Sequence, residues 1–191
     1  FRQPWQEAQT SLTARGLLTP DGLELTPTGL AAARSLRLAR PPIYYWYRDF
    51  YLRTANSPAN AEFCRRVYGR DLCQQGFMDM DQLDLAVQQT DVGQGCRVLD
   101  LGCGAGQIAE YISDQTGARV WGMDYIPEAI ELAQARTASK RERLDFRVGS
   151  LDRLEYPPAS FDVLLAFDTL YMPVDLLDTL RQMRALLAPG G

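Results

Sequence analysis

The 191-residue chain contains no histidine, and Lys140 is the single lysine among its 20 basic residues. Without histidine, a general base has to be an aspartate, glutamate, tyrosine, cysteine or water molecule. The net charge of −4 argues against a general binder of polyanions. No apolar run approaches the roughly 20 residues that a membrane-spanning helix needs, so the sequence predicts no such helix.

Cysteines are few and irregularly spaced, and the four of them are Cys64, Cys73, Cys96 and Cys103. A structural zinc site would need all four, and none of them forms a close Cys-x-x-Cys pair, so no metal site is predicted. The residues after Phe1 lack the basic, apolar and small-residue zones of a secretory leader. These features predict a cytoplasmic protein with reduced thiols.

The most informative stretch present is residues 98–109, with the sequence VLDLGCGAGQIA. An apolar run contains Asp100 near its end, three alternating glycines follow, and an amphipathic pattern begins, which predicts a strand, a tight loop and a helix. Glycines let the backbone turn sharply and let a ligand approach the main chain. A dinucleotide-binding fingerprint would need a sixth-position glycine counted from Gly102, and Gln107 stands there.

The pattern Asp-x-Gly-x-Gly-x-Gly resembles the S-adenosylmethionine (SAM) loop of class I methyltransferases. The resemblance implies that SAM is the cofactor and that the loop lies against it. The small Cys103 would pack under the ligand, as small residues often do in that family. The loop residues implied to contact SAM are Asp100, Gly102, Cys103, Gly104 and Gly106.

A second short strand is predicted over residues 119–124, and Pro127 then opens a helix. In the methyltransferase family, the acid at the end of this strand, here Asp124, accepts hydrogen bonds from both ribose hydroxyls. The alternative is an exposed turn-forming acid at a strand end. The residues beside the cofactor at this and the two later strand ends would be Tyr125, Ser150, Leu151 and Phe167.

The third and fourth predicted strands cover residues 144–148 and 161–167. Family members commonly carry Gly-Asp after the third strand, where the acid accepts from the adenine amino group. This chain has Ser150 at that position, so Asp152 or backbone amides are the alternatives for that contact.

Asp168 and Tyr171 follow the fourth strand, where the family brings the methyl donor and its acceptor together. Asp168 is therefore the candidate to orient the acceptor or to take its proton. Its alternative role is to cap the following turn, and the alternative for Tyr171 is simple packing.

Residues 1–40 read as a separate unit, with a helix over 6–18, a short strand over 23–25 and a second helix that continues through Arg40. The pattern resembles the second half of a winged-helix domain whose first helices are absent. Five arginines against three acids give a net charge of +2 (5 − 3), whereas the remainder sums to −6. DNA binding, dimerisation and capping of an active site are the roles that this unit leaves open.

Residues 41–95 resemble the helical lid that precedes the glycine loop in small-molecule methyltransferases. Pro41-Pro42 breaks the preceding helix, and residues 59–89 predict one or two helices split around Gly76. An aromatic stripe covers residues 43–51, and such stripes pack in a core more often than they bind ligands. Aromatic faces suit a sulfonium cation, which makes Tyr45 and Tyr47 the candidate lid residues.

The predicted fold is a Rossmann-like α/β domain over residues 96–191, with parallel strands in the order 3-2-1-4. An amphipathic helix is expected over 174–187, and residues 189–191 form the turn that precedes the fifth strand in the methyltransferase family. The chain therefore reads as truncated before that strand.

The predicted activity is transfer of a methyl group from SAM to a small-molecule acceptor, with a homodimer left open. Two alternatives remain. A transcriptional regulator would sense SAM through this domain, and an aminopropyl transferase would use decarboxylated SAM. The second alternative calls for extra acids around the pocket, whereas Ser150 stands in place of one.

Overall fold

The computed structural model describes residues 2–39 and 44–191, which form two separate units of the chain. The expected break at Pro41-Pro42 and the expected helical Arg40 lie outside the described residues. No helix among the described residues is long and apolar enough to cross a membrane.

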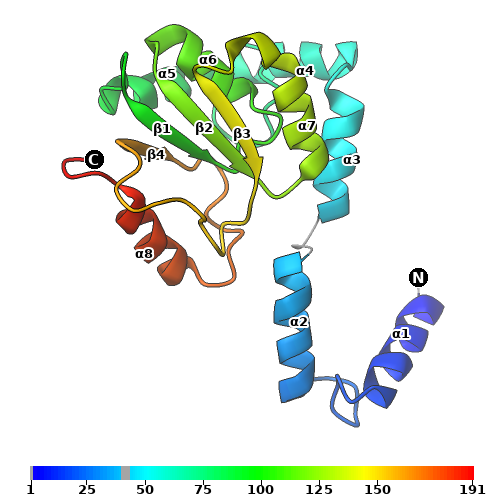
Figure 1. The fold of residues 1–191 in the computed structure, drawn as a ribbon. Coiled ribbons are helices and arrows are strands. Elements are labelled where there is room, and N and C mark those ends of the chain that lie inside the picture. The colour runs from blue at the N-terminus through cyan, green and yellow to red at the C-terminus, as the bar shows by residue number, and fades with distance from the viewer. Residues whose placement is uncertain (1, 40–43) are drawn as a thin grey trace. The chain divides into compact units, whose positions relative to one another are not determined.

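A parallel sheet lies at the centre of the second unit (Figure 1). Its strands are β1 (Arg97–Leu101), β2 (Arg119–Asp124), β3 (Leu144–Val148) and β4 (Val163–Leu165). The order is β3-β2-β1-β4 with every pair parallel, so the predicted fold class and strand order are confirmed. All four carboxyl ends therefore meet at one edge, which is where open α/β sheets bind ligands.

Helices cover both faces of the sheet, because successive strand residues point to opposite sides. Val98 packs in a cluster with α5 (Met80–Gln89), α6 (Gln107–Thr116) and α7 (Pro127–Arg136). On the other face, Leu99, Leu101 and Leu186 of α8 (Leu176–Leu186) belong to a second cluster. In Figure 1, α8 accordingly lies on the opposite side of the sheet from α5 and α6. A short 3-10 helix, η1 (Ala138–Lys140), leads into β3.

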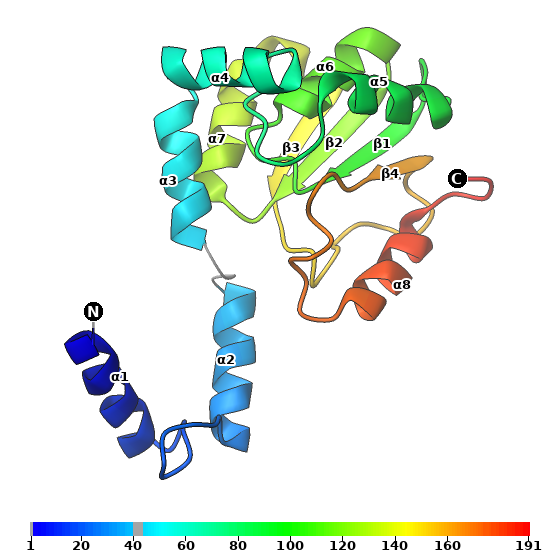
Figure 2. The ribbon, with the colours of Figure 1, turned by 180° about the vertical axis from the view of Figure 1, so that it is seen from behind.

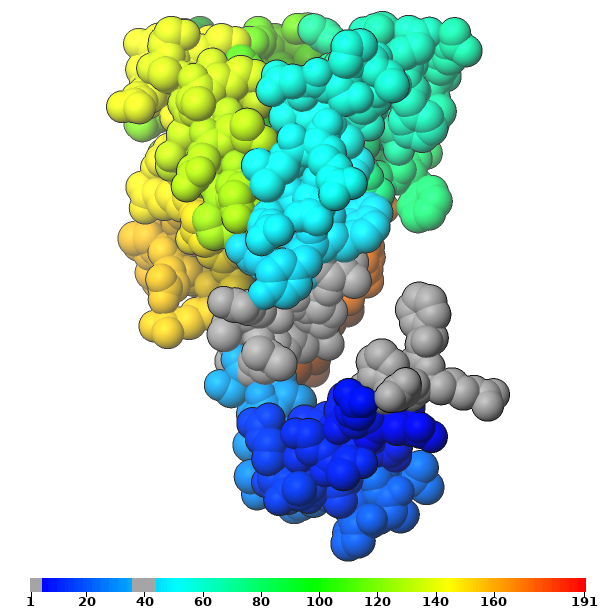
Figure 3. Space-filling model, turned by 90° about the vertical axis from the view of Figure 1, so that its right-hand side faces the viewer, coloured from blue at the N-terminus to red at the C-terminus, as the bar shows by residue number. Residues whose placement is uncertain are grey.

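Two further helices, α3 (Tyr44–Thr54) and α4 (Pro58–Tyr68), precede α5. Ser57 caps α4 at its start, and Gly69 ends it in the left-handed conformation with φ of 89°. Helix α3 packs beside α7, as the cyan and yellow-green surfaces of Figure 3 show. The connection between α4 and α5, residues 69–79, runs past the carboxyl ends of the strands (Figure 2).

In the first unit, α1 (Arg2–Ala14) and α2 (Pro27–Ala39) flank a turn. The helix expected over 6–18 thus ends early, because Gly16 adopts a left-handed φ of 67°. The strand expected over 23–25 is wrong: the structure has one isolated antiparallel bridge between Leu18 and Leu25. Two residues that meet once form no ladder, so they do not make a hairpin.

Candidate functional site

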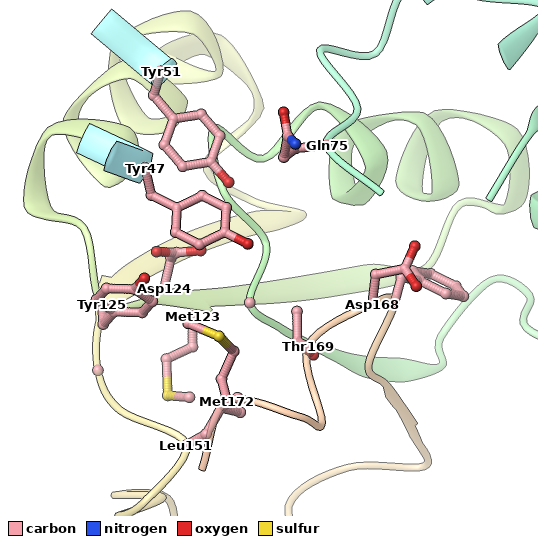
Figure 4. A pocket seen from close by; sticks show the side chains of 13 residues that line it. Tyr47, Tyr51, Gln75, Met123, Asp124, Tyr125, Leu151, Asp168, Thr169 and Met172 are labelled. Carbon is pink, nitrogen blue, oxygen red and sulfur yellow. The ribbon is translucent and has the colours of Figure 1, made fainter. Parts of the chain in front are cut away.

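A cleft with two lobes lies at the carboxyl ends of β1, β2 and β4, and Figure 4 shows the larger lobe. The lobes are partly open, and the space in them, counted with the solvent that reaches into them, is about 540 Å³ and 440 Å³. Four residues line both lobes, namely Tyr51, Gln75, Gly102 and Phe167. The two lobes therefore form one continuous cleft.

The glycine loop forms the floor of the smaller lobe. Gly104 and Gly106 have left-handed φ angles of 53° and 74°, which other residues rarely adopt. A Cβ atom on Gly104 would collide with the Tyr51 hydroxyl, and one on Gly106 would lie 2.5 Å from the Phe146 ring. Backbone conformation and close packing thus both require glycine at these two positions.

Asp124 ties the end of β2 to this loop. Its Oδ2 accepts a hydrogen bond of 2.8 Å from the Gly104 amide, and its Oδ1 accepts one of 2.9 Å from Ile126. Burial raises the pKa of Asp124 to about 6, although both amide hydrogen bonds act in the opposite direction. The carboxylate lies beneath the Tyr47 ring in Figure 4 and lines the larger lobe, so each oxygen retains acceptor capacity toward the cleft.

Asp100 is a second buried carboxylate, only 3% exposed, and it lines the smaller lobe. In the described part of the chain, no donor forms a hydrogen bond to its side chain. Burial, with a smaller contribution from the charge of Asp124, raises the pKa of Asp100 to about 7. A buried carboxylate without a donor is costly to ionise, so this position favours a positively charged ligand group.

Tyrosine side chains cover the larger lobe from above. Tyr47 and Tyr51, one helical turn apart on α3, direct their hydroxyls toward the cleft in Figure 4. The Tyr47 and Tyr171 hydroxyl oxygens lie 3.3 Å apart, which joins α3 to the segment after β4. The Tyr125 hydroxyl is buried and has no partner among the described residues. Burial raises the pKa of Tyr51 well above its usual value, so that phenol stays neutral.

Asp168 lies at the far side of the same lobe, with a left-handed φ of 52°. Its Oδ2 accepts a hydrogen bond of 2.7 Å from the Phe77 amide, in the segment between α4 and α5. The neighbouring Thr169 hydroxyl donates to the Leu101 carbonyl over 2.9 Å. The side chain of Asp168 therefore bonds across the cleft rather than to the turn that follows it.

The structure brings most of the residues predicted from the sequence to the cleft. Those that line it are Asp100, Gly102, Cys103, Gly104, Gly106, Asp124, Tyr125, Leu151, Phe167 and Asp168. Tyr171 is 66% exposed and reaches the rim through Tyr47. The roles assigned to these residues stay predictions.

Ser150 does not line the cleft. Its Oγ accepts a hydrogen bond of 3.2 Å from the Asp152 amide and so stabilises a turn. Asp152 does not line the cleft either, and its Oδ1 accepts a hydrogen bond from the Val174 amide. No acid from the segment between β3 and β4 therefore lines the cleft among the described residues.

Several residues that cover the cleft were not predicted from the sequence. Tyr51, rather than Tyr45, lines the cleft with Tyr47, while Tyr45 is 53% exposed. Helical spacing of four residues was the available signal, since it places 47 and 51 on one face. Gln75 had no such signal, because it belongs to an irregular connection. The other missed lining residues are Leu72, Cys73, Gln74, Ala105, Gln107, Ile108, Met123, Gly149, Thr169 and Met172.

Burial raises the pKa of the Cys103 thiol well above its usual value, so this thiol stays protonated. All four cysteines are free. Among the residues that the structure describes, no cluster of three or more histidine, cysteine or acidic side chains is arranged to hold a metal ion.

Comparison with known proteins adds independent information. Residues 98–191 match a protein family described as "Methyltransferase domain". A "Ubiquinone biosynthesis O-methyltransferase" from Methylocella silvestris is 37% identical over 98 residues, which cover 51% of this chain and 38% of that protein. The chain thus spans about two fifths of the length of this relative.

Two solved structures share the fold. "Phosphoethanolamine N-methyltransferase 2" from Haemonchus contortus, in complex with S-adenosyl-L-methionine, matches with a TM-score of 0.61 at 22% identity, over 76% of this chain and 34% of that one. The "[4+2]-Cyclase SpnF" matches with a TM-score of 0.55 at 26% identity, over 58% of this chain and 42% of that one. The fold alone therefore does not determine the reaction.

Proposed function

Because residues 98–191 belong to the methyltransferase-domain family, we propose that the chain binds SAM in its two-lobed cleft and transfers the methyl group to a small molecule. The observation that carries the proposal is the pair of buried acids, Asp124 and Asp100. Asp124 is fixed to the glycine loop by a backbone amide, and Asp100 receives no hydrogen bond from any residue that the structure describes.

The two acids have separate roles toward the cofactor. Asp124 accepts hydrogen bonds from the ribose hydroxyls, because each of its oxygens has one amide donor and a remaining lone pair. Asp100 faces the ammonium group of the methionine part, which provides the positive charge that a buried carboxylate requires. The Gly102, Cys103, Gly104 and Gly106 amides already donate to protein acceptors, so the amides at the start of α6 are the ones left for the ligand's carboxylate.

SAM supplies a methyl group that is already activated on a sulfonium sulfur. The protein then mainly has to align donor and acceptor and to exclude water. The hydroxyls of Tyr47 and Tyr51 point toward the cleft, so their phenol oxygens lie on the side that the cationic sulfur would approach. This chemistry agrees with a chain that contains no histidine.

We place the acceptor in the larger lobe, bordered by Asp168 and, at the rim, Tyr171. No lysine or arginine lines this lobe among the described residues, and two carboxylates do. An anionic acceptor would be repelled there, so the acceptor is neutral or cationic where it enters. The name of the Methylocella relative makes an oxygen acceptor the first class to test.

Other predictions from the sequence stay predictions. They concern the three-part division into residues 1–40, 41–95 and 96–191 and a cytoplasmic location, with a homodimer left open and contact of the first unit with nucleic acid as the less favoured alternative. The first unit is expected to cap an active site or to serve in dimerisation, because its positive charge is too modest to favour DNA binding.

Calorimetric titration of the chain with SAM tests the proposal. One SAM should bind per chain, and Asp124→Ala should weaken binding by about 1–3 kcal/mol, which is the value of a hydrogen bond to a charged acceptor. Ser150→Ala is the matched control, since the Ser150 hydroxyl stabilises a turn outside the cleft. Equal SAM affinity in the parent and the Asp124 variant would reject the assignment.

A further inference from the structure

We propose that Asp168 is a positioning residue: its carboxylate holds residues 74–77 over the cleft and thereby slows the release of SAM. The inference rests on the function proposed above. It concerns the cofactor side of the reaction and gives Asp168 a role other than that of a base.

The first support is a hydrogen bond that crosses the cleft. The Phe77 amide donates to Asp168 Oδ2 over 2.7 Å, although the two residues are 91 positions apart. Phe77 belongs to the connection between α4 and α5, whereas Asp168 follows β4 on the opposite wall. A backbone donor paired with a carboxylate makes a stronger bond than a neutral pair does.

The second support is the space around Gly76. A Cβ atom at this position would overlap Asp168 Oδ2 and would lie 3.0 Å from the Asp168 Cγ. Gly76 does not have a left-handed φ, so the local conformation alone does not require glycine. Glycine is needed because the Asp168 carboxylate occupies the space where a side chain would begin.

The remaining contacts of this segment lie on its own side of the cleft. The Tyr68 hydroxyl donates to the Gly76 carbonyl over 3.0 Å, and the Leu72 amide donates to Gln74 Oε1 over 2.8 Å. These bonds fix the shape of the segment. The bond to Asp168 joins it to the far wall, where Gln75 lines both lobes and covers their junction.

Asp168 is itself fixed by the sheet. The adjacent Thr169 hydroxyl bonds to the carbonyl of Leu101, the last residue of β1. The carboxylate is therefore presented by the same strand ends that carry the floor of the cleft. Its Oδ2 is already engaged by the Phe77 amide, so we expect the side chain to act on the segment rather than on a proton of the acceptor.

Two substitutions at Asp168 distinguish a role as hydrogen-bond acceptor for the Phe77 amide from a role as a base. Asp168→Asn retains a side-chain carbonyl that can accept the Phe77 amide, whereas Asp168→Ala removes the acceptor. We expect SAM to dissociate roughly tenfold faster from the alanine variant, and within about threefold of the parent rate from the asparagine variant. Stopped-flow measurement of SAM release gives both rates.

Amide hydrogen exchange in the ligand-free protein provides a readout that does not depend on SAM. The Phe77 amide should exchange faster in Asp168→Ala than in the parent, and Asp168→Asn should restore most of the protection.

Gly76→Ala is a second variant with Asp168 intact, and it should reproduce both effects of Asp168→Ala. Gly93→Ala is its control, because a Cβ atom there meets no atom closer than 3.9 Å. Unchanged Phe77 exchange in Asp168→Ala and Gly76→Ala would overturn the inference. So would an asparagine variant as defective as the alanine variant. If the parent itself binds no SAM, the proposed function fails, and the exchange data still decide the role of Asp168.

Discussion

The floor and the roof of the cleft are held together by different interactions. The floor consists of β1, β2 and the glycine loop, where Val98, Leu99 and Leu101 are fully buried in a continuous parallel ladder. The roof consists of α3 and of residues 69–79. Helix α3 packs on the glycine loop and α7 through a buried cluster that includes Tyr51, Ala105 and Ala129, whereas residues 69–79 reach the segment after β4 through the hydrogen bond from the Phe77 amide to Asp168. We therefore expect the floor to be preformed and residues 69–79 to open separately from the rest of the fold.

The largest expected effect is a loss of stability caused by a substitution in the floor. Gly106→Val adds a side chain at a left-handed φ of 74°, 2.5 Å from the Phe146 ring. Strain and overpacking should together lower the free energy of unfolding by about 3 kcal/mol or more. Urea denaturation followed by circular dichroism measures this loss.

The matching change in the roof is Gly76→Ala, which should cost less than about 1 kcal/mol, because its neighbour is a side chain on a separable segment. Equal losses of stability for the two variants would mean that floor and roof unfold as one unit.

A smaller effect concerns pH. The pKa of Asp100, about 7, and that of Asp124, about 6, are raised because burial disfavours the charged forms. Bound SAM favours those charged forms, so SAM affinity should rise as the pH increases from 5 to 7.5, by about tenfold or more. Calorimetric titration with SAM at several pH values measures this change in affinity.

The ligand-free protein should show the opposite trend. The folded state holds protons that the unfolded state has released, so the free energy of unfolding falls as the pH rises from about 4 to 7. If SAM affinity is independent of pH while Asp100→Asn leaves it unchanged, the buried acids do not face the cofactor's positive charge.

The floor could be predicted from the sequence because its signals are local. The glycine spacing, the acid that ends β2 and the apolar strands each occupy a short stretch, and parallel pairing then brings the strand ends together. The roof could not be predicted in the same way. The contact between Phe77 and Asp168 joins two irregular segments far apart in the chain, and no periodic pattern in the sequence predicts it. Ser150 shows the limit of the resemblance, since it occupies a family position without lining the cleft.

The central claim is that the two buried acids of the floor recognise different parts of SAM. Titrating Asp100→Asn and Asp124→Asn with SAM and with 5′-methylthioadenosine, which lacks the amino-acid part, tests it most directly. Asp100→Asn should weaken SAM binding by about tenfold and leave 5′-methylthioadenosine within about twofold of the parent, whereas Asp124→Asn should weaken both ligands. Equal weakening of both ligands by Asp100→Asn, or no weakening of either by Asp124→Asn, would contradict the account.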